Sequence, residues 1–71
     1  MNQVNPKKVL DSKWTALLPK NREKHFVITR CSYSAPNKLD KVFLQAVLTG
    51  AVYEIAWRDL KDSNVWRIGW Q

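Results

Sequence analysis

The sequence has few of the residues on which catalytic and metal sites are built. Its 71 residues include one cysteine, one histidine and two glycines. Two isolated glycines exclude a glycine-rich phosphate loop, and a metal site needs three or four ligands at useful spacing. His25 and Cys31 would stand about 20 Å apart in one strand, too far for a nucleophile and its base. We therefore expect a non-enzymatic protein with no metal and no cofactor.

Long apolar runs are also missing. No stretch approaches the ~18 apolar residues of a membrane span, and no apolar segment follows the first charges as it does in a signal peptide. A single cysteine cannot form an internal disulfide and is typical of a reducing compartment. We expect a cytoplasmic protein with no membrane partner, in which residues 1–8 form a flexible basic leader and 9–71 a single domain.

The sequence is rich in tryptophan, which offers a substitute for the missing disulfides. A domain of this size buries only about 60% of the surface of its unfolded chain, and each buried indole removes ~150–250 Å² from water. The simplest role of these rings is to fill a small core. Any ring left outside is free to bind a ligand. The four are Trp14, Trp57, Trp66 and Trp70.

Alternating side chains and turn residues predict an all-β fold. β-Branched and aromatic residues gather in short segments that Pro, Gly, Asn and Ser separate. We expect a small antiparallel sheet of three to four strands, curled toward a partly open barrel, with a short helical turn near the C-terminus. The expected strands are 13–18, 25–33, 41–49 and 52–57, with a turn at 19–23, a loop at 34–38, the helical turn within 58–64, and a short strand or folded tail at 65–71.

The hairpin around Gly50 and Ala51 is the clearest local signal. Glycine at the first central position suits a two-residue type II′ turn, which would pair Thr49 with Val52 and Leu44 with Trp57. This register predicts one fully apolar face, because side chains alternate along each strand. That face would contain Val42, Leu44, Ala46, Leu48, Tyr53, Ile55 and Trp57.

Positive charge is concentrated in the first part of the chain. The formal net charge is +6, of which residues 1–30 carry +5. Cations beside aromatic rings on a small sheet are suited to holding phosphates and stacking bases. The specific hypothesis is therefore a binding module for nucleic acid or another polyanion. Its candidate residues are Lys13, Trp14, Lys20, Arg22, Lys24 and Arg30.

The alternative is a module for protein interaction or homodimerisation. Trp and Arg are common anchors of protein interfaces, and an apolar patch left outside the core would dock a partner. The unpaired edge of a small sheet favours the same outcome. The candidate residues cluster toward the C-terminus and are Trp57, Trp66, Arg67 and Trp70.

Several short segments resemble a small Trp-rich family of bacterial proteins described as conserved hypothetical, a domain of unknown function. The resemblance runs from about Val9 onward. It implies a stand-alone bacterial cytoplasmic protein, and it carries no activity, cofactor or catalytic residue. The segments are Lys13-Trp14-Thr15, Asn21-Arg22-Glu23-Lys24-His25-Phe26, Leu48-Thr49-Gly50, Trp57-Arg58-Asp59-Leu60, and Trp66 with Gly69-Trp70.

Overall fold

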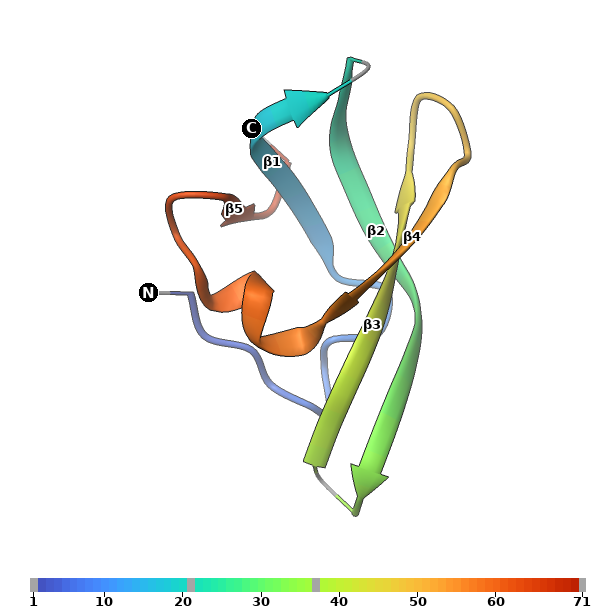
Figure 1. Ribbon diagram of the computed structural model, residues 1–71, viewed down its shortest axis with the longest axis vertical. Coiled ribbons are helices and arrows are strands. Elements are labelled where there is room, and N and C mark those ends of the chain that lie inside the picture. The colour runs from blue at the N-terminus through green and yellow to red at the C-terminus, as the bar shows by residue number, and fades with distance from the viewer. Residues whose placement is uncertain (1, 21, 37, 71) are drawn as a thin grey trace.

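A computed structural model shows one antiparallel five-stranded sheet in the order β4-β3-β2-β1-β5 (Figure 1). It describes residues 2–20, 22–36 and 38–70. Met1, Asn21, Asn37 and Gln71, which fall in the predicted leader, turn, loop and tail, lie outside the described residues. The elements are β1 (Lys13–Lys20), β2 (Glu23–Ala35), β3 (Lys38–Ala46), β4 (Val52–Ala56), the 3-10 helix η1 (Trp57–Lys61) and β5 (Trp66–Ile68).

The predicted all-β class and the predicted helical turn are confirmed, whereas the predicted number of strands is too low. The fifth strand arises because the tail pairs with β1, with Trp14 opposite Ile68 and Ala16 opposite Trp66. β4 and β5 both remain edges, so the sheet curls without closing. β1 also runs through Pro19, where its pairing with β2 is irregular and a residue without an N–H is tolerated.

The hairpin between β3 and β4 has a longer loop than the sequence predicts. Leu44 pairs with Tyr53 instead of Trp57, so residues 47–51 form the loop, and the Gly50 N–H donates to the Ala46 carbonyl at 2.8 Å. The predicted two-residue turn is therefore wrong. The register moves by four residues, an even number, so every strand residue keeps its predicted face. Leu48, predicted on the apolar face, lies in the loop and is 68% exposed.

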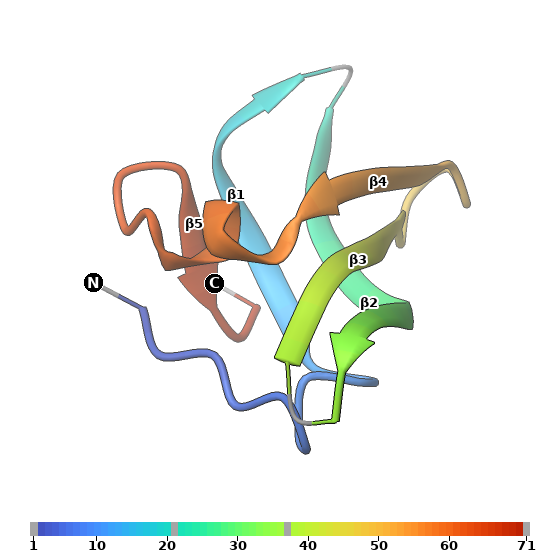
Figure 2. The same cartoon turned by 60° about the horizontal axis from the view of Figure 1, so that its bottom comes forward.

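The core lies on one side of the sheet, which we call the inner face. The inner face takes its buried side chains from β1, β2 and β3, while η1 contributes Leu60 and the N-terminal segment contributes Val9. Both of these segments lie on the same side of the sheet (Figures 1 and 2). Phe26 packs its ring edge-to-face on Trp66, with 5.3 Å between centroids. The buried apolar residues are Val9, Trp14, Ala16, Phe26, Ile28, Leu39, Val42, Leu44, Ala46 and Leu60.

Hydrogen bonds connect the N-terminal segment to distant parts of the fold. The Asn2 side-chain amide donates to the carbonyls of Leu60 at 2.8 Å and Trp66 at 2.7 Å. The Tyr33 hydroxyl donates to the Pro6 carbonyl at 2.7 Å. Residues 2–6 therefore bridge η1, β5 and β2. The flexibility that we expect of residues 1–8 stays a prediction.

Candidate functional site

The strand register divides the side chains between the inner face and the opposite surface of the sheet, which we call the outer face. Residues opposite each other in an antiparallel pair share a face. Lys13 pairs with Val27, and Val27 with Gln45, while Arg30 pairs with Phe43 and Phe43 with Glu54. Charged and polar side chains therefore collect on the outer face. They include Lys13, His25, Arg30, Lys41, Glu54 and Arg67.

The C-terminal tail brings Trp70 onto the outer face. Gly69 has a φ of +81°, a conformation that glycine adopts without steric cost, and it turns the chain after β5. The Gly69 N–H donates to the Lys13 carbonyl at 2.8 Å, and its carbonyl accepts from the Thr15 hydroxyl at 2.7 Å. Two hydrogen bonds to β1 thus fix the position from which Trp70 leaves the sheet.

The Trp70 ring is held in place although it is 44% exposed. Its indole N–H donates to the Phe26 carbonyl at 3.0 Å. The His25 ring lies 5.8 Å away between centroids, and the Lys13 ammonium lies 4.8 Å from the Trp70 ring centroid. A hydrogen bond, a ring contact and a cation–π contact therefore orient an indole that water still reaches.

Cations outnumber carboxylates on the outer face. Of the outer-face residues named above, Lys13, Arg30, Lys41 and Arg67 are cations and Glu54 is a carboxylate, which pairs with the Lys41 ammonium at 3.5 Å. Within the described ranges, Lys13, Arg30 and Arg67 form no ion pair. Lys13 lies beside the exposed indole, and Arg30 and Arg67 add positive charge to the same face, which attracts anions.

The structure separates the residues predicted to bind a polyanion. Lys13 and Arg30 lie on the outer face, whereas Lys20 lines a pocket on the inner face. Arg22 and Lys24 border a hollow at the start of β2, beside His25. The prediction that Trp14 contacts a polyanion is wrong, because the Trp14 side chain is 2% exposed and its indole N–H donates to the Ser12 hydroxyl at 2.8 Å. A buried core ring cannot stack on a base.

The four residues predicted to form a protein-interaction patch do not share one surface. Trp57 packs against the core and holds the Lys61 ammonium 4.6 Å from its ring centroid. Trp66 belongs to the inner face, while Arg67 and Trp70 belong to the outer face. The outer face instead combines residues from the two predicted sites. Trp70 and Arg67 come from the predicted protein-interaction site, and Lys13 and Arg30 come from the predicted polyanion-binding site.

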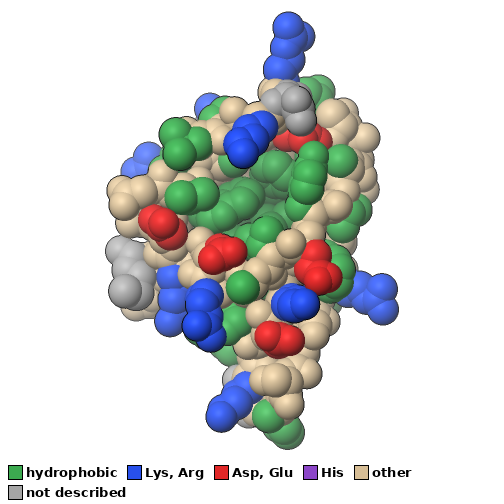
Figure 3. Space-filling model, in the orientation of Figure 1, with side chains coloured by type: hydrophobic (Ala, Val, Ile, Leu, Met, Phe, Trp, Pro, Cys, Tyr) green, Lys and Arg blue, Asp and Glu red, His purple; other side chains and the backbone are tan. Residues whose placement is uncertain are grey.

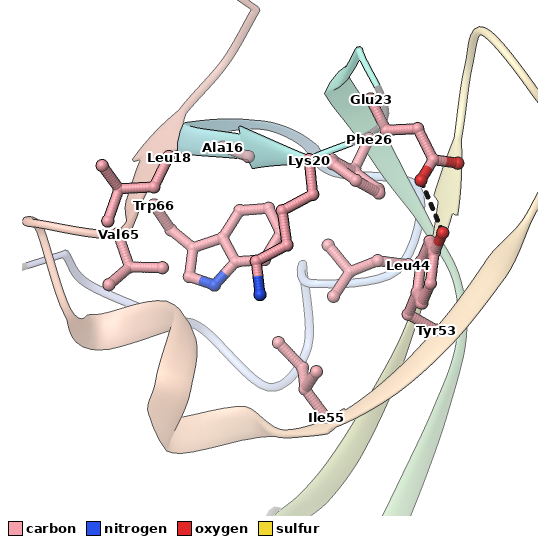
Figure 4. A pocket seen from close by; sticks show the side chains of 10 residues that line it. All are labelled: Ala16, Leu18, Lys20, Glu23, Phe26, Leu44, Tyr53, Ile55, Val65 and Trp66. Atoms are coloured by element: carbon pink, nitrogen blue, oxygen red, sulfur yellow. Dashed lines mark hydrogen bonds between the residues drawn. The ribbon is translucent and has the colours of Figure 1, made fainter.

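Sequence reasoning also missed an apolar pocket on the inner face, which we call the inner pocket. It has a volume of about 280 Å³, and Figure 3 shows it as a hollow lined by hydrophobic side chains. It lies between β4 on one side and β1 and β5 on the other, because the sheet does not close between its edge strands β4 and β5. No local motif marks it, because its walls come from all five strands. The apolar lining includes Ala16, Leu18, Phe26, Leu44, Ile55 and Trp66 (Figure 4).

A hydrogen-bonded carboxylate closes one end of the inner pocket. The Tyr53 hydroxyl donates to one Glu23 oxygen at 2.5 Å, and the Thr49 hydroxyl donates to the other. These two donors lower the pKa of Glu23 below its ordinary value of 4.5, with the bond from Thr49 as the larger cause. The same bond to Glu23 raises the pKa of Tyr53. Glu23 is therefore ionised at neutral pH, and each of its oxygens accepts one hydrogen bond.

Other chemistry-bearing groups are dispersed. Among residues 2–20, 22–36 and 38–70, no three His, Cys, Asp or Glu side chains gather closely enough to hold a metal ion. Partial burial, with a smaller effect from the charge of Asp11, raises the pKa of the Cys31 thiol. The described part of the chain contains no helix long and apolar enough to cross a membrane.

Comparison with known proteins assigns the chain to a family. No match was found among curated proteins or among solved structures. A match to a family of unknown function covers residues 12–71, which include all five strands and every tryptophan. The chain therefore belongs to the family described as "Tryptophan-rich protein (DUF2389)".

Proposed function

We propose that the outer face binds single-stranded nucleic acid. The observation that supports this proposal is the exposed but fixed Trp70 ring, which stands beside the Lys13 ammonium on a surface that also carries Arg30 and Arg67. Proteins that bind single strands combine stacking rings with cations that follow the backbone. Because a duplex hides the faces of its bases, an exposed ring favours an unpaired strand.

Each group has a distinct role in this proposal. One base stacks on the accessible part of Trp70, a contact that contributes about 1–3 kcal/mol in such proteins. Lys13, Arg30 and Arg67 neutralise neighbouring phosphates and release counterions. His25 supports the indole from the sheet, with their centroids 5.8 Å apart. The bond from Trp70 to the Phe26 carbonyl fixes the ring before binding, so little side-chain entropy is lost on stacking.

The test is a titration with a labelled oligothymidylate of about ten nucleotides, repeated over a range of salt concentrations. Three phosphate contacts predict a slope of log K against log salt near −2, from about −0.7 per contact on a single strand. Trp70→Ala should weaken binding by roughly 5- to 150-fold, which corresponds to 1–3 kcal/mol. Trp70→Phe keeps a ring and should retain part of the affinity.

Matched charge variants separate this site from general attraction to a basic protein. Arg30→Gln and Arg67→Gln should each make the salt slope shallower by about 0.7. Lys61→Gln removes the same charge from η1, on the inner side of the sheet, and should leave the slope unchanged. Equal effects of all three variants, or no binding at low salt, would refute the proposal.

A further inference from the structure

We propose that the inner pocket binds a small carboxylate ligand with an apolar body. The pocket is separate from the outer face, because its walls are inner-face side chains. Its volume of about 280 Å³ is near the lower end of the ~300–1,000 Å³ typical of ligand sites. A cavity of about 150 Å³ lined by aliphatic and aromatic groups binds benzene, so this pocket has room for a ring and a short chain.

The apolar lining selects the body of the ligand. Phe26 and Trp66 stand edge-to-face at one wall, with 5.3 Å between their centroids, and Leu44 and Ile55 form the facing wall (Figure 4). Water in such a space finds few hydrogen-bond partners, so an apolar group that displaces it gains free energy. This edge-to-face aromatic pair favours contact with an aromatic or straight aliphatic body.

The charged lining residues select the head group. Lys20 is the cation of the pocket, its side chain extends over the mouth, and it forms no ion pair with any residue that the structure describes (Figure 4). Glu23, the anion, already accepts hydrogen bonds from the Tyr53 and Thr49 hydroxyls on its two oxygens. Glu23 keeps its negative charge, but it has no proton to donate to a ligand. The Lys20 ammonium is therefore the charged group of the lining that can donate hydrogen bonds, and it favours a carboxylate head group.

Acidic groups at the other end of the pocket fix the orientation of the ligand. Asp59 and Asp62 border an adjoining hollow that shares Ile55, Val65 and Trp66 with the inner pocket. Carboxylates at this end repel a second carboxylate. At the opposite end Lys20 offsets the single negative charge of Glu23, so the head group lies beside Lys20 and the apolar body points toward Ile55 and Val65.

Three probes of similar shape test which charge the pocket prefers on the head group of its ligand. They are 4-phenylbutyrate, 4-phenylbutanol and 4-phenylbutylamine, titrated into the full chain while ¹H–¹⁵N NMR spectra are recorded. The butyrate should shift the indole and backbone signals of Trp66 and the backbone signals of Leu18 and Ile55, and should bind about five-fold more tightly than the alcohol. Tighter binding of the amine, shifts confined to other residues, or no saturable shift with the butyrate would overturn the proposal.

Surface variants show whether Lys20 acts as proposed without risk to the core. Lys20→Gln should weaken the butyrate about five-fold and leave the alcohol unchanged, whereas Lys24→Gln should affect neither. Leu18 is 70% exposed at the rim, so Leu18→Glu should fold and should repel the butyrate. Equal loss of butyrate and alcohol in Lys20→Gln would show that the charge has no role. A pocket that accepts only an apolar side chain of a protein would give the same result and would also overturn the proposal.

Discussion

Replacement of Leu60 by alanine tests whether the single turn of η1 completes the core. Leu60 is fully buried, and the substitution removes three carbon atoms, which corresponds to about 2.4 kcal/mol of transfer free energy at 0.8 per group. The Asn2 amide holds the Leu60 carbonyl at 2.8 Å, which limits collapse of η1 into the cavity. We therefore expect a loss near 3 kcal/mol, within the 2–5 measured for such changes. The total free energy of unfolding of a domain of this length is about 4–11 kcal/mol.

The assay is urea unfolding followed by tryptophan fluorescence and far-UV circular dichroism. With a denaturant slope of about 1 kcal/mol per molar, Leu60→Ala should lower the midpoint by about 3 M, or leave the protein partly unfolded without urea. Leu48→Ala is the matched control, because this leucine is exposed in the β3–β4 loop, and its effect should stay within about 0.5 kcal/mol. Similar midpoints for the two variants would show that η1 does not close the core.

Three further predictions concern single groups. Hydrogen bonds lower the pKa of Glu23 in the folded state, so the stability that they contribute is present above pH 4.5 and is lost as the pH falls through the folded pKa. Tyr53→Phe removes one of these bonds. In urea titrations, the difference in unfolding free energy between wild type and Tyr53→Phe should therefore shrink below pH 4. Gly50→Ala should lower the unfolding free energy by about 1–2 kcal/mol in the same assay, because alanine is strained at a φ of +79°. The added Cβ meets no atom closer than 3.8 Å, so no steric clash contributes. An unchanged midpoint would contradict this backbone strain. The raised pKa of Cys31 should slow its reaction with a disulfide reagent at pH 8, and Asp11→Asn should speed the reaction without changing the fold; equal rates would exclude an effect of the Asp11 charge.

The two faces of the β3–β4 hairpin could be predicted from the sequence, but its register could not. Alternation of side chains has a period of two, so it distinguishes odd from even shifts and cannot separate two even registers. A two-residue turn at Gly50 was consistent with every local preference. The longer loop depends on distant contacts, since Thr49 donates to Glu23 and the Val47 N–H donates to the His25 carbonyl at 3.0 Å.

Composition alone could not distinguish the core tryptophans from the exposed one. Trp14 follows Lys13, and Trp70 follows Gly69, and neither context predicts burial. In the structure, Trp14 pairs with Phe26 and its side chain is buried. Trp70 stays outside because the Gly69 turn and the Thr15 hydroxyl direct the tail across β1. Lys13 and Trp70 come together only when the two ends of the domain pair, a contact for which residue spacing gives no signal.

The pairing of β5 with β1 has a consequence for the order in which the chain folds. Strands β1 to β4 follow one another as neighbours in the sheet, so loops of a few residues suffice to join them. Trp14 and Ile68, in contrast, meet only after a 54-residue loop closes, which costs about 3.5 kcal/mol of chain entropy when nothing else is formed. The last strand is therefore expected to dock onto a preformed meander of β1 to β4. Until it docks, the meander exposes hydrophobic surface through which it can aggregate with other unfolded chains.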